Sequence, residues 1–462
     1  MIAKRPFAPE QAYLLFGHLL FLGLFALAAI HHVERTIHVD SAFQIFKWVQ
    51  LDEVEVEAHR YTAILPQLLV KLGKGLGIGL NGLLMIASLA HVAVAYLIFL
   101  LGAYLMRTPW IAVAVSLSAV LCTRLTFYGI VLEANYLLCY PLLLASVVQS
   151  ALLRKPGGGS VVATAMALLL VLLVHPLGFL VALAVLIWYY LATPGNRKQL
   201  LVLIGIALVW GMLGRVIFPP STYEAALYGS AADGLLSEVP GANAAMGFLF
   251  GHSWRDTTTY LPFWLLAFAV LFMLVRDRAW PLAMLFALSI GGYILLNALT
   301  YRAGESAMMM EKNFLPLAVL VAFPLFSRIE RLPVRTRWWL LIPFVAVVFV
   351  QFRGVSFASR PAKERVDLVR AMVADARAQG HAKVAVPSTV LDAGGYHVHW
   401  ALPFESLLLS GIVGPANASQ WSPCPLAEKH RERRKWALPL ADPFATDLLD
   451  QRFFTLPKET TC

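Results

Sequence analysis

Charged side chains are scarce in this chain of 462 residues. Asp, Glu, Lys and Arg make up 14% of it and apolar residues 59%, and the mean hydropathy is +0.70. A soluble domain usually has about 25% charged residues, because its surface must stay hydrated. The shortage of charge excludes a soluble protein of this length and indicates that a lipid bilayer is the solvent for most of the chain.

Acidic residues are the scarcer charge: 27 Asp and Glu stand against 37 Lys and Arg, which gives a formal net charge of +10. The basic residues lie in short clusters between apolar segments and do not form one surface interleaved with aromatic residues. This distribution argues against a nucleic-acid partner. Cysteine is scarce too, and of the four residues only Cys424 and Cys462 lie in a polar region, where an oxidising compartment would let them pair.

Long apolar runs are abundant up to about residue 353 and then stop. A hydrocarbon core about 30 Å thick takes about 20 residues per spanning helix. The runs predict about eleven transmembrane helices, near residues 11–30, 79–105, 109–125, 127–152, 160–175, 177–193, 199–218, 259–276, 280–299, 313–327 and 338–353. The runs near 109–125 and 160–175 are short, which leaves the number open by about one or two.

The basic residues of the short loops give the orientation, because Lys and Arg are retained on the cytoplasmic side of a membrane. A cytoplasmic N-terminus places all of the following inside: Lys4 and Arg5, Arg107, Arg154 and Lys155, Arg197 and Lys198, Arg276 and Arg278, and Arg328, Arg331, Arg335 and Arg337. The same orientation places residues 31–78, 219–258, 300–312 and the tail outside. The high Ala, Leu and Val usage fits a bacterial inner membrane, so that the outside is the periplasm.

The chain divides into a transmembrane domain, residues 1–353, and a C-terminal periplasmic domain, residues 354–462. Residues 361–380 show helical spacing of apolar side chains and end in a glycine, a usual helix stop. A strand is predicted for Lys383–Pro387, followed by a turn at Gly394-Gly395. The predicted fold class is an all-α polytopic membrane protein with a small C-terminal α/β domain outside the membrane.

The outer loop 31–78 contains Asp40, directly before a stretch from Ser41 to Val49 with apolar residues at helical spacing. The spacing predicts an amphipathic helix on the membrane surface, with Trp48 at headgroup depth. Asp40 either caps this helix, since Asp is a preferred N-cap residue, or serves as a general base held at the surface. The residues alone leave both roles open.

Other polar side chains near the outer helix ends are candidates for a site, because a charge that faces lipid is costly. Arg124 and Glu133 are expected to face each other as an ion pair or to line a cavity, and His38 and His175 are further candidates for its lining. Five basic residues suit either a phosphate group or ordinary lipid headgroups: Arg60, His252, Arg255, Arg302 and Lys312.

A metal site is the weaker interpretation of the histidines in the first outer loop. His31, His32, Glu34, His38 and Asp40 lie close together in the sequence, but no HExxH pair is present and the spacing matches no well-known zinc motif. No cofactor is assigned, and participation of a divalent cation is left open.

Taken together, these features resemble the GT-C class of integral membrane glycosyltransferases over about residues 5–353. The resemblance rests on the cytoplasmic N-terminus, the long first outer loop with its surface helix, helices of uneven length and an outer C-terminal domain. The specific local match is Ile37-His38-Val39-Asp40-Ser41, where the class carries an acidic residue shortly after the first helix. It implies that Asp40 deprotonates an acceptor hydroxyl or positions the acceptor.

The resemblance also implies an activity: inverting transfer of a sugar from a polyprenyl-phosphate donor to a glycan, lipid or protein acceptor, at the outer face and among membrane lipids. Basic side chains near the leaving phosphate would stabilise its charge. Two other classes stay open. A transporter or lipid flippase would place charges at a midplane site between two related halves, and a non-catalytic component of polysaccharide export would use the tail for assembly.

Overall fold

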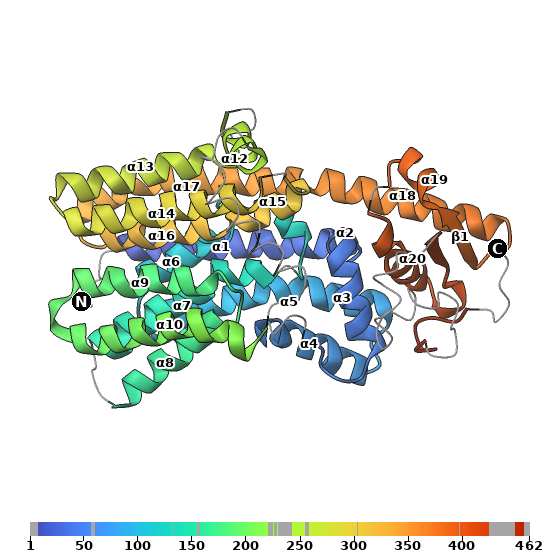
Figure 1. Cartoon of the computed structure of the whole chain (residues 1–462), viewed down its shortest axis with the longest axis horizontal. Helices are drawn as coiled ribbons and strands as arrows, with labels where there is room; N and C mark the ends of the chain where they lie inside the picture. The colour runs from blue at the N-terminus through green and yellow to red at the C-terminus, as the bar shows by residue number, and fades with distance from the viewer. Residues whose placement is uncertain are drawn as a thin grey trace, which may run out of the picture.

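The computed structural model describes residues 8–56, 61–131, 133–154, 158–219, 225, 229, 243–254, 258–302, 304–396, 398–424 and 449–456. Long helices lie side by side in one elongated bundle, and a smaller unit formed by the C-terminal part of the chain lies beyond one end of it (Figure 1). This end of the bundle is called the tail end below.

Seven helical stretches among the described residues are long and apolar enough to cross a membrane. They contain α1 (Pro9–Ile30), α5 (Leu80–Leu100), α7 (Tyr140–Val147), α10 (Arg197–Ile217), α14 (Trp280–Thr300), α16 (Pro316–Ile329) and α17 (Val334–Phe357). Shorter apolar helices accompany them: α6 (Pro109–Ser118), α8 (Gly158–Leu172), α9 (Gly178–Ala192) and α13 (Leu261–Arg276). The chain is a mostly helical integral membrane protein.

Each apolar segment predicted from the sequence contains one of these helices, so the predominantly helical fold class is confirmed. The number of membrane crossings stays a prediction, because the shorter apolar helices have only 10–17 residues. The orientation across the membrane stays a prediction as well.

The structure differs from the prediction where the segments near 109–125 and 127–152 meet. The sequence predicts two regular helices here. In the structure the end of the first and the start of the second are irregular and contain two short 3-10 helices: η4 (Leu125–Tyr128) and η5 (Glu133–Leu138). Cys122 has a φ of +60°, a left-handed conformation that is uncommon for a residue with a side chain. This irregular stretch carries four buried polar residues: Thr123, Thr126, Glu133 and Asn135.

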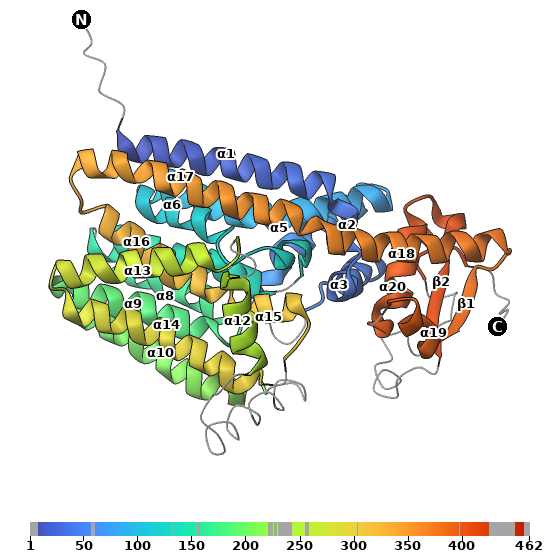
Figure 2. The same cartoon turned by 90° about the horizontal axis from the view of Figure 1, so that it is seen from above.

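The interior of the bundle is apolar and buried from solvent. Nearly every residue of α16 is buried, because this helix is apolar on all sides and packs against α6, α9, α13 and α14 (Figure 2). Peripheral α10 instead exposes Leu201, Val202, Met212 and Val216. An exposed apolar face of this kind fits a helix surrounded by lipid.

The C-terminal unit starts with α18 (Ser359–Ala378), which follows α17 almost in line (Figure 2). Its further elements are β1 (Lys383–Pro387), α19 (Ser388–Ala393), α20 (Leu402–Gly411) and β2 (Gln420–Cys424). The two strands pair in parallel, with Lys383 opposite Gln420. The predicted helix over 361–380 and the predicted strand are confirmed, whereas the division of the chain at residue 353 stays a prediction.

The remaining described elements are short. They are α2 (His32–Thr36), α3 (Val39–Gln50), α4 (Ile64–Gly75), α12 (Ala244–Trp254), α15 (Ala307–Phe314), η2 (Tyr61–Ala63), η3 (Leu101–Leu105), η6 (Val148–Leu153), η7 (Pro194–Asn196), η8 (His399–Ala401) and η9 (Pro415–Asn417).

Helix α3 corresponds to the amphipathic helix predicted after Asp40, but its apolar face is covered by protein, and its place on the membrane surface stays a prediction. Every residue from Ser41 to Val49 is buried. Phe43 and Phe46 pack on Phe404 of α20, with ring centroids 5.1 and 5.3 Å apart. Hydropathy cannot distinguish a protein neighbour from a lipid neighbour, so the sequence did not reveal that the C-terminal unit covers this apolar face.

Candidate functional site

Asp40 lies in the first turn of α3, two residues after His38, which occupies the N-cap position. The interpretation of Asp40 as the cap is therefore wrong by two positions. A carboxylate in the first turn is still favoured by the helix dipole, whose positive end lies there. Asp40 is partly buried, and α3 lies at the tail end of the bundle, close to the C-terminal unit (Figure 1).

The residue before Asp40 has an unusual backbone conformation. Val39 has a φ of +39°, although a β-branched side chain disfavours the left-handed region. Such a conformation costs about 1–3 kcal/mol and persists only where the surroundings impose it. Here the Val39 backbone N–H donates a hydrogen bond of 2.6 Å to Oε1 of Glu405 in α20.

Glu405 is the centre of a buried polar junction. Its side chain is completely buried, and both of its oxygens accept hydrogen bonds from Arg365 of α18, at 2.8 Å from Nε and 3.1 Å from Nη2. The Tyr396 hydroxyl also donates to Glu405, and the Arg365 guanidinium lies 4.2 Å from the centre of the Tyr396 ring. A buried carboxylate is tolerated when its charge and lone pairs are satisfied in this way.

His38 lies next to this junction, and its surroundings keep it neutral near pH 7. Burial first, and the positive charge of Arg365 second, lower the pKa of His38 to about 4, and Glu405 only partly opposes the shift. The start of α3 therefore combines one neutral imidazole and one carboxylate, His38 and Asp40. Of the predicted site residues, these two are brought together.

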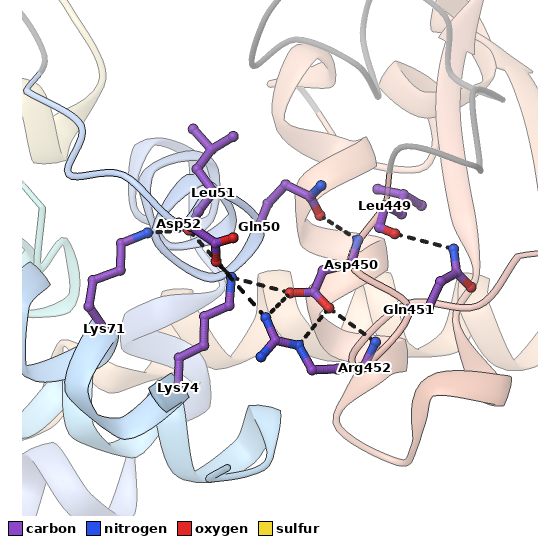
Figure 3. A network of polar contacts seen from close by, with 9 residues as sticks. All are labelled: Gln50, Leu51, Asp52, Lys71, Lys74, Leu449, Asp450, Gln451 and Arg452. Carbon is purple, nitrogen blue, oxygen red and sulfur yellow. Dashed lines mark hydrogen bonds and ion pairs between the residues drawn. The ribbon is translucent and has the colours of Figure 1, made fainter. Parts of the chain in front are cut away.

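A second polar junction lies at the other end of α3 (Figure 3). Lys74 of α4 is 2.8 Å from Asp52 and 3.2 Å from Asp450, whose carboxylate also binds Arg452 at 2.7 Å. The backbone N–H of Asp450 donates to Gln50, the last residue of α3, at 3.0 Å. The C-terminal part of the chain thus binds both ends of α3.

The same junction changes the proton affinity of its charged groups. A hydrogen bond from Lys74, together with its charge, holds the pKa of Asp52 below its usual range. Lys71, which donates to the Leu51 carbonyl, has a pKa lowered to about 8, by burial first and by the charge of Lys74 second.

Arg35 is a buried cation that the sequence analysis missed. Its guanidinium donates to the Phe127 carbonyl at 2.9 Å and to the carbonyl and hydroxyl of Ser88 at 2.7 Å each, and it pairs with Nδ1 of His91 at 2.9 Å. It also lies 4.1 Å from the centre of the Phe127 ring. These contacts fix α2 to α5 and η4, and so they fix the path of the chain from α1 to α3.

Arg124 was expected to face Glu133, and the structure brings Glu311 of α15 to it. The carboxylate of Glu311 accepts from the backbone N–H groups of Arg124, Leu125 and Thr126 at 2.6, 3.1 and 2.9 Å, and from the Thr126 hydroxyl at 2.6 Å. The Arg124 guanidinium donates to Thr259 at 2.9 Å. Glu311 caps η4, and Glu133 is buried at the start of η5.

The predicted phosphate-binding residues are spread over several elements. His252 lies on α12, where its Nδ1 bonds the Phe248 carbonyl at 2.9 Å, and Lys312 lies on α15 beside Glu311. The Arg302 carbonyl accepts from the N–H of Ala244 at 3.1 Å, which joins its loop to α12. Helices α12 and α15 contact each other near the tail end of the bundle (Figures 1 and 2).

The remaining predicted site residues are Arg60, Arg255 and His175. Arg60 and Arg255 lie outside the described residues. His175 lies in the turn between α8 and α9, where its Nδ1 accepts from the Leu177 N–H at 3.2 Å. A cavity shared by Asp40 and the basic side chains stays a prediction.

A cavity of about 40 Å³ lies inside the bundle, among α1, α5, α6 and η5. Its polar lining residues are His91, Thr123, Asn135 and Tyr136, and Asp40 is not among its lining residues. A cavity of this volume has room for water molecules.

The geometry of residues 31–40 bears on the metal site considered for their histidines. Among the described residues, which include His31, His32, Glu34, His38 and Asp40, no group of three or more His, Cys, Asp or Glu side chains is placed to hold a metal ion.

Comparison with protein-family models, curated proteins and solved structures finds no match to this chain.

Proposed function

We propose that this protein is a glycosyltransferase that takes a sugar from a polyprenyl-phosphate donor at the outer face of a membrane, with Asp40 as its general base. The observation that supports this proposal most is the placement of Asp40. It follows a strained residue whose N–H binds a buried carboxylate, and strained backbone clusters at functional sites.

The chemistry proposed for Asp40 is an inverting displacement. Its carboxylate accepts the proton of the acceptor hydroxyl while that oxygen forms a bond to the anomeric carbon of the sugar. The bond from this carbon to the phosphate oxygen breaks, and its electron pair stays on the phosphate. His38, neutral near pH 7, adds no positive charge that would stabilise the Asp40 carboxylate and weaken it as a base.

Positive charge is needed at the leaving phosphate, and Lys312 and Arg302 are the described candidates for it. Lys312 lies on α15 and Arg302 on the loop before it. Arginine can bind two phosphate oxygens at once, and lysine contributes a compact charge.

The test is sugar transfer in membranes that contain the protein. Membranes with and without it are incubated with a panel of polyprenyl-phosphate sugars, and labelled product is followed together with its anomeric configuration. The proposal expects a product of inverted configuration that depends on the protein. If no donor of the panel is used, the proposal is rejected, and the buried contact of α3 with the C-terminal unit then favours a role in assembly.

A further inference from the structure

A carboxylate of the C-terminal unit binds the backbone at the start of α3. Glu405 accepts from the Val39 N–H at 2.6 Å, and Arg365 holds the same carboxylate with two hydrogen bonds. Glu405 and Arg365 belong to α20 and α18, whereas Val39 belongs to the first outer loop, 366 residues before Glu405 in the chain.

We infer that Glu405 is a positioning residue for Asp40, so that the site is complete only when the C-terminal unit is docked on α3. This inference rests on the proposed function for the role of Asp40. Asp40 immediately follows Val39, so the direction of its side chain depends on the backbone conformation that Glu405 holds. Without an acceptor at this point, Val39 would relax toward negative φ and turn Asp40 away.

The structure supplies reasons for the rigidity of Glu405 itself. Its side chain is fully buried, and Arg365 and Tyr396 hold it from two sides. A carboxylate with both oxygens satisfied by fixed donors has little freedom to move. The position of the Val39 N–H is therefore set by the C-terminal unit and not by α3 alone.

The junction at the far end of α3 provides a matched control. Asp450 also joins the C-terminal part of the chain to this region, through its backbone N–H on Gln50 of α3 and its carboxylate on Lys74 of α4, and Asp450→Ala removes only the second contact. It lies at the opposite end of the helix from Asp40. A variant at Asp450 loosens the docking without touching Val39.

The experiment measures hydrogen exchange of the purified full-length protein in lipid nanodiscs, for wild type, Glu405→Ala, Glu405→Gln and Asp450→Ala. Glu405→Ala is expected to speed the exchange of the Val39–Phe43 amides by about tenfold or more, since local opening becomes easier. Asp450→Ala should leave this peptide unchanged. Glu405→Gln keeps an oxygen for the Val39 N–H and should lie between Glu405→Ala and wild type, and it also serves if Glu405→Ala fails to fold.

Sugar transfer is measured on the same samples. Glu405→Ala should lower kcat with little change in KM, and Glu405→Gln should restore part of kcat. Equal exchange of Val39–Phe43 in wild type and in both Glu405 variants would overturn the inference, and so would an equal effect of Asp450→Ala. If the wild type transfers no sugar, the proposed function fails, while the exchange data still decide whether Glu405 holds the start of α3.

Discussion

The two ends of α3 are held by the same part of the chain in different ways. At its start the side chain of Glu405 is 0% exposed and the side chain of its partner Arg365 is 15% exposed. At its other end Lys74 and Asp450 are also covered, at 5% and 12% exposed, but their partners Asp52 and Arg452 are 90% and 58% exposed. One junction is a closed set of buried partners, and the other is a covered pair with exposed partners.

This difference indicates which junction contributes more to stability. Removing one partner of a buried ion pair leaves a charge without compensation, which costs about 3–5 kcal/mol, whereas an exposed pair contributes about 0–1 kcal/mol. We therefore expect the loss of Glu405 to disturb the start of α3 more than the loss of exposed Arg452 disturbs its other end. Four variants test this comparison, from the largest expected effect to the smallest.

Glu405→Ala is expected to lower the free energy of unfolding by about 3–5 kcal/mol, because it leaves Arg365 buried without its carboxylate and removes the acceptor of the Val39 N–H. Chemical unfolding in detergent, followed by tryptophan fluorescence, measures the change. A loss below about 1 kcal/mol would mean that the junction is no stronger than an exposed pair.

Glu311→Ala extends the comparison to a buried carboxylate that binds backbone N–H groups. It should cost about 2–3 kcal/mol, since the N–H groups of Arg124, Leu125 and Thr126 lose their acceptor inside the protein. The same unfolding assay applies, with Glu311→Gln as the control that keeps one acceptor oxygen. An unchanged midpoint for Glu311→Ala would show that water replaces the carboxylate and that η4 is not buried as described.

The pH dependence of stability should report on His38. Its pKa is about 4 in the folded protein and 6.5 without burial, so the unfolded chain binds the proton more tightly. The contribution to stability is complete above pH 6.5 and is lost as the pH falls through about 4. Thermal unfolding from pH 8 to pH 4 is compared between wild type and His38→Asn, in which Asn can cap α3. The slope of stability against pH between pH 6.5 and 4 should be smaller in the variant. Equal slopes in the two proteins would mean that other groups cause the pH dependence.

Arg452→Gln should have the smallest effect, below about 1 kcal/mol, because Arg452 is exposed and its interaction with Asp450 is screened by salt. Unfolding at low and high salt checks this: the difference from wild type should disappear at high salt. A loss as large as that of Glu405→Ala would reverse the order of the two junctions.

The sequence predicted the parts of this fold that depend on local patterns. The apolar segments, the helix over 361–380 and the strand Lys383–Pro387 each follow from periodicity within one short stretch. The helix after Asp40 was predicted for the same reason, but its neighbour was not. Its apolar face meets residues about 360 positions later in the chain, such as Phe404, and periodicity does not encode contacts of that range.

The most informative polar residues were missed for a related reason. Glu405 is the single carboxylate within the apolar helix Leu402–Gly411, and an isolated charge in such a helix is a signal that sequence reasoning could have used. Arg35 follows two histidines and a glutamate, a pattern typical of an exposed loop. Its burial depends on acceptors from α5 and η4, which no local pattern indicates.

The most direct test of the proposed role of Asp40 is kcat for sugar transfer by Asp40→Asn, measured on purified protein with the donor that the wild type uses. Loss of a general base should lower kcat by about 100-fold or more, while the free energy of unfolding and the exchange of the Val39–Phe43 amides stay as in wild type. A kcat within about threefold of the wild-type value would contradict the assignment of Asp40 as the base.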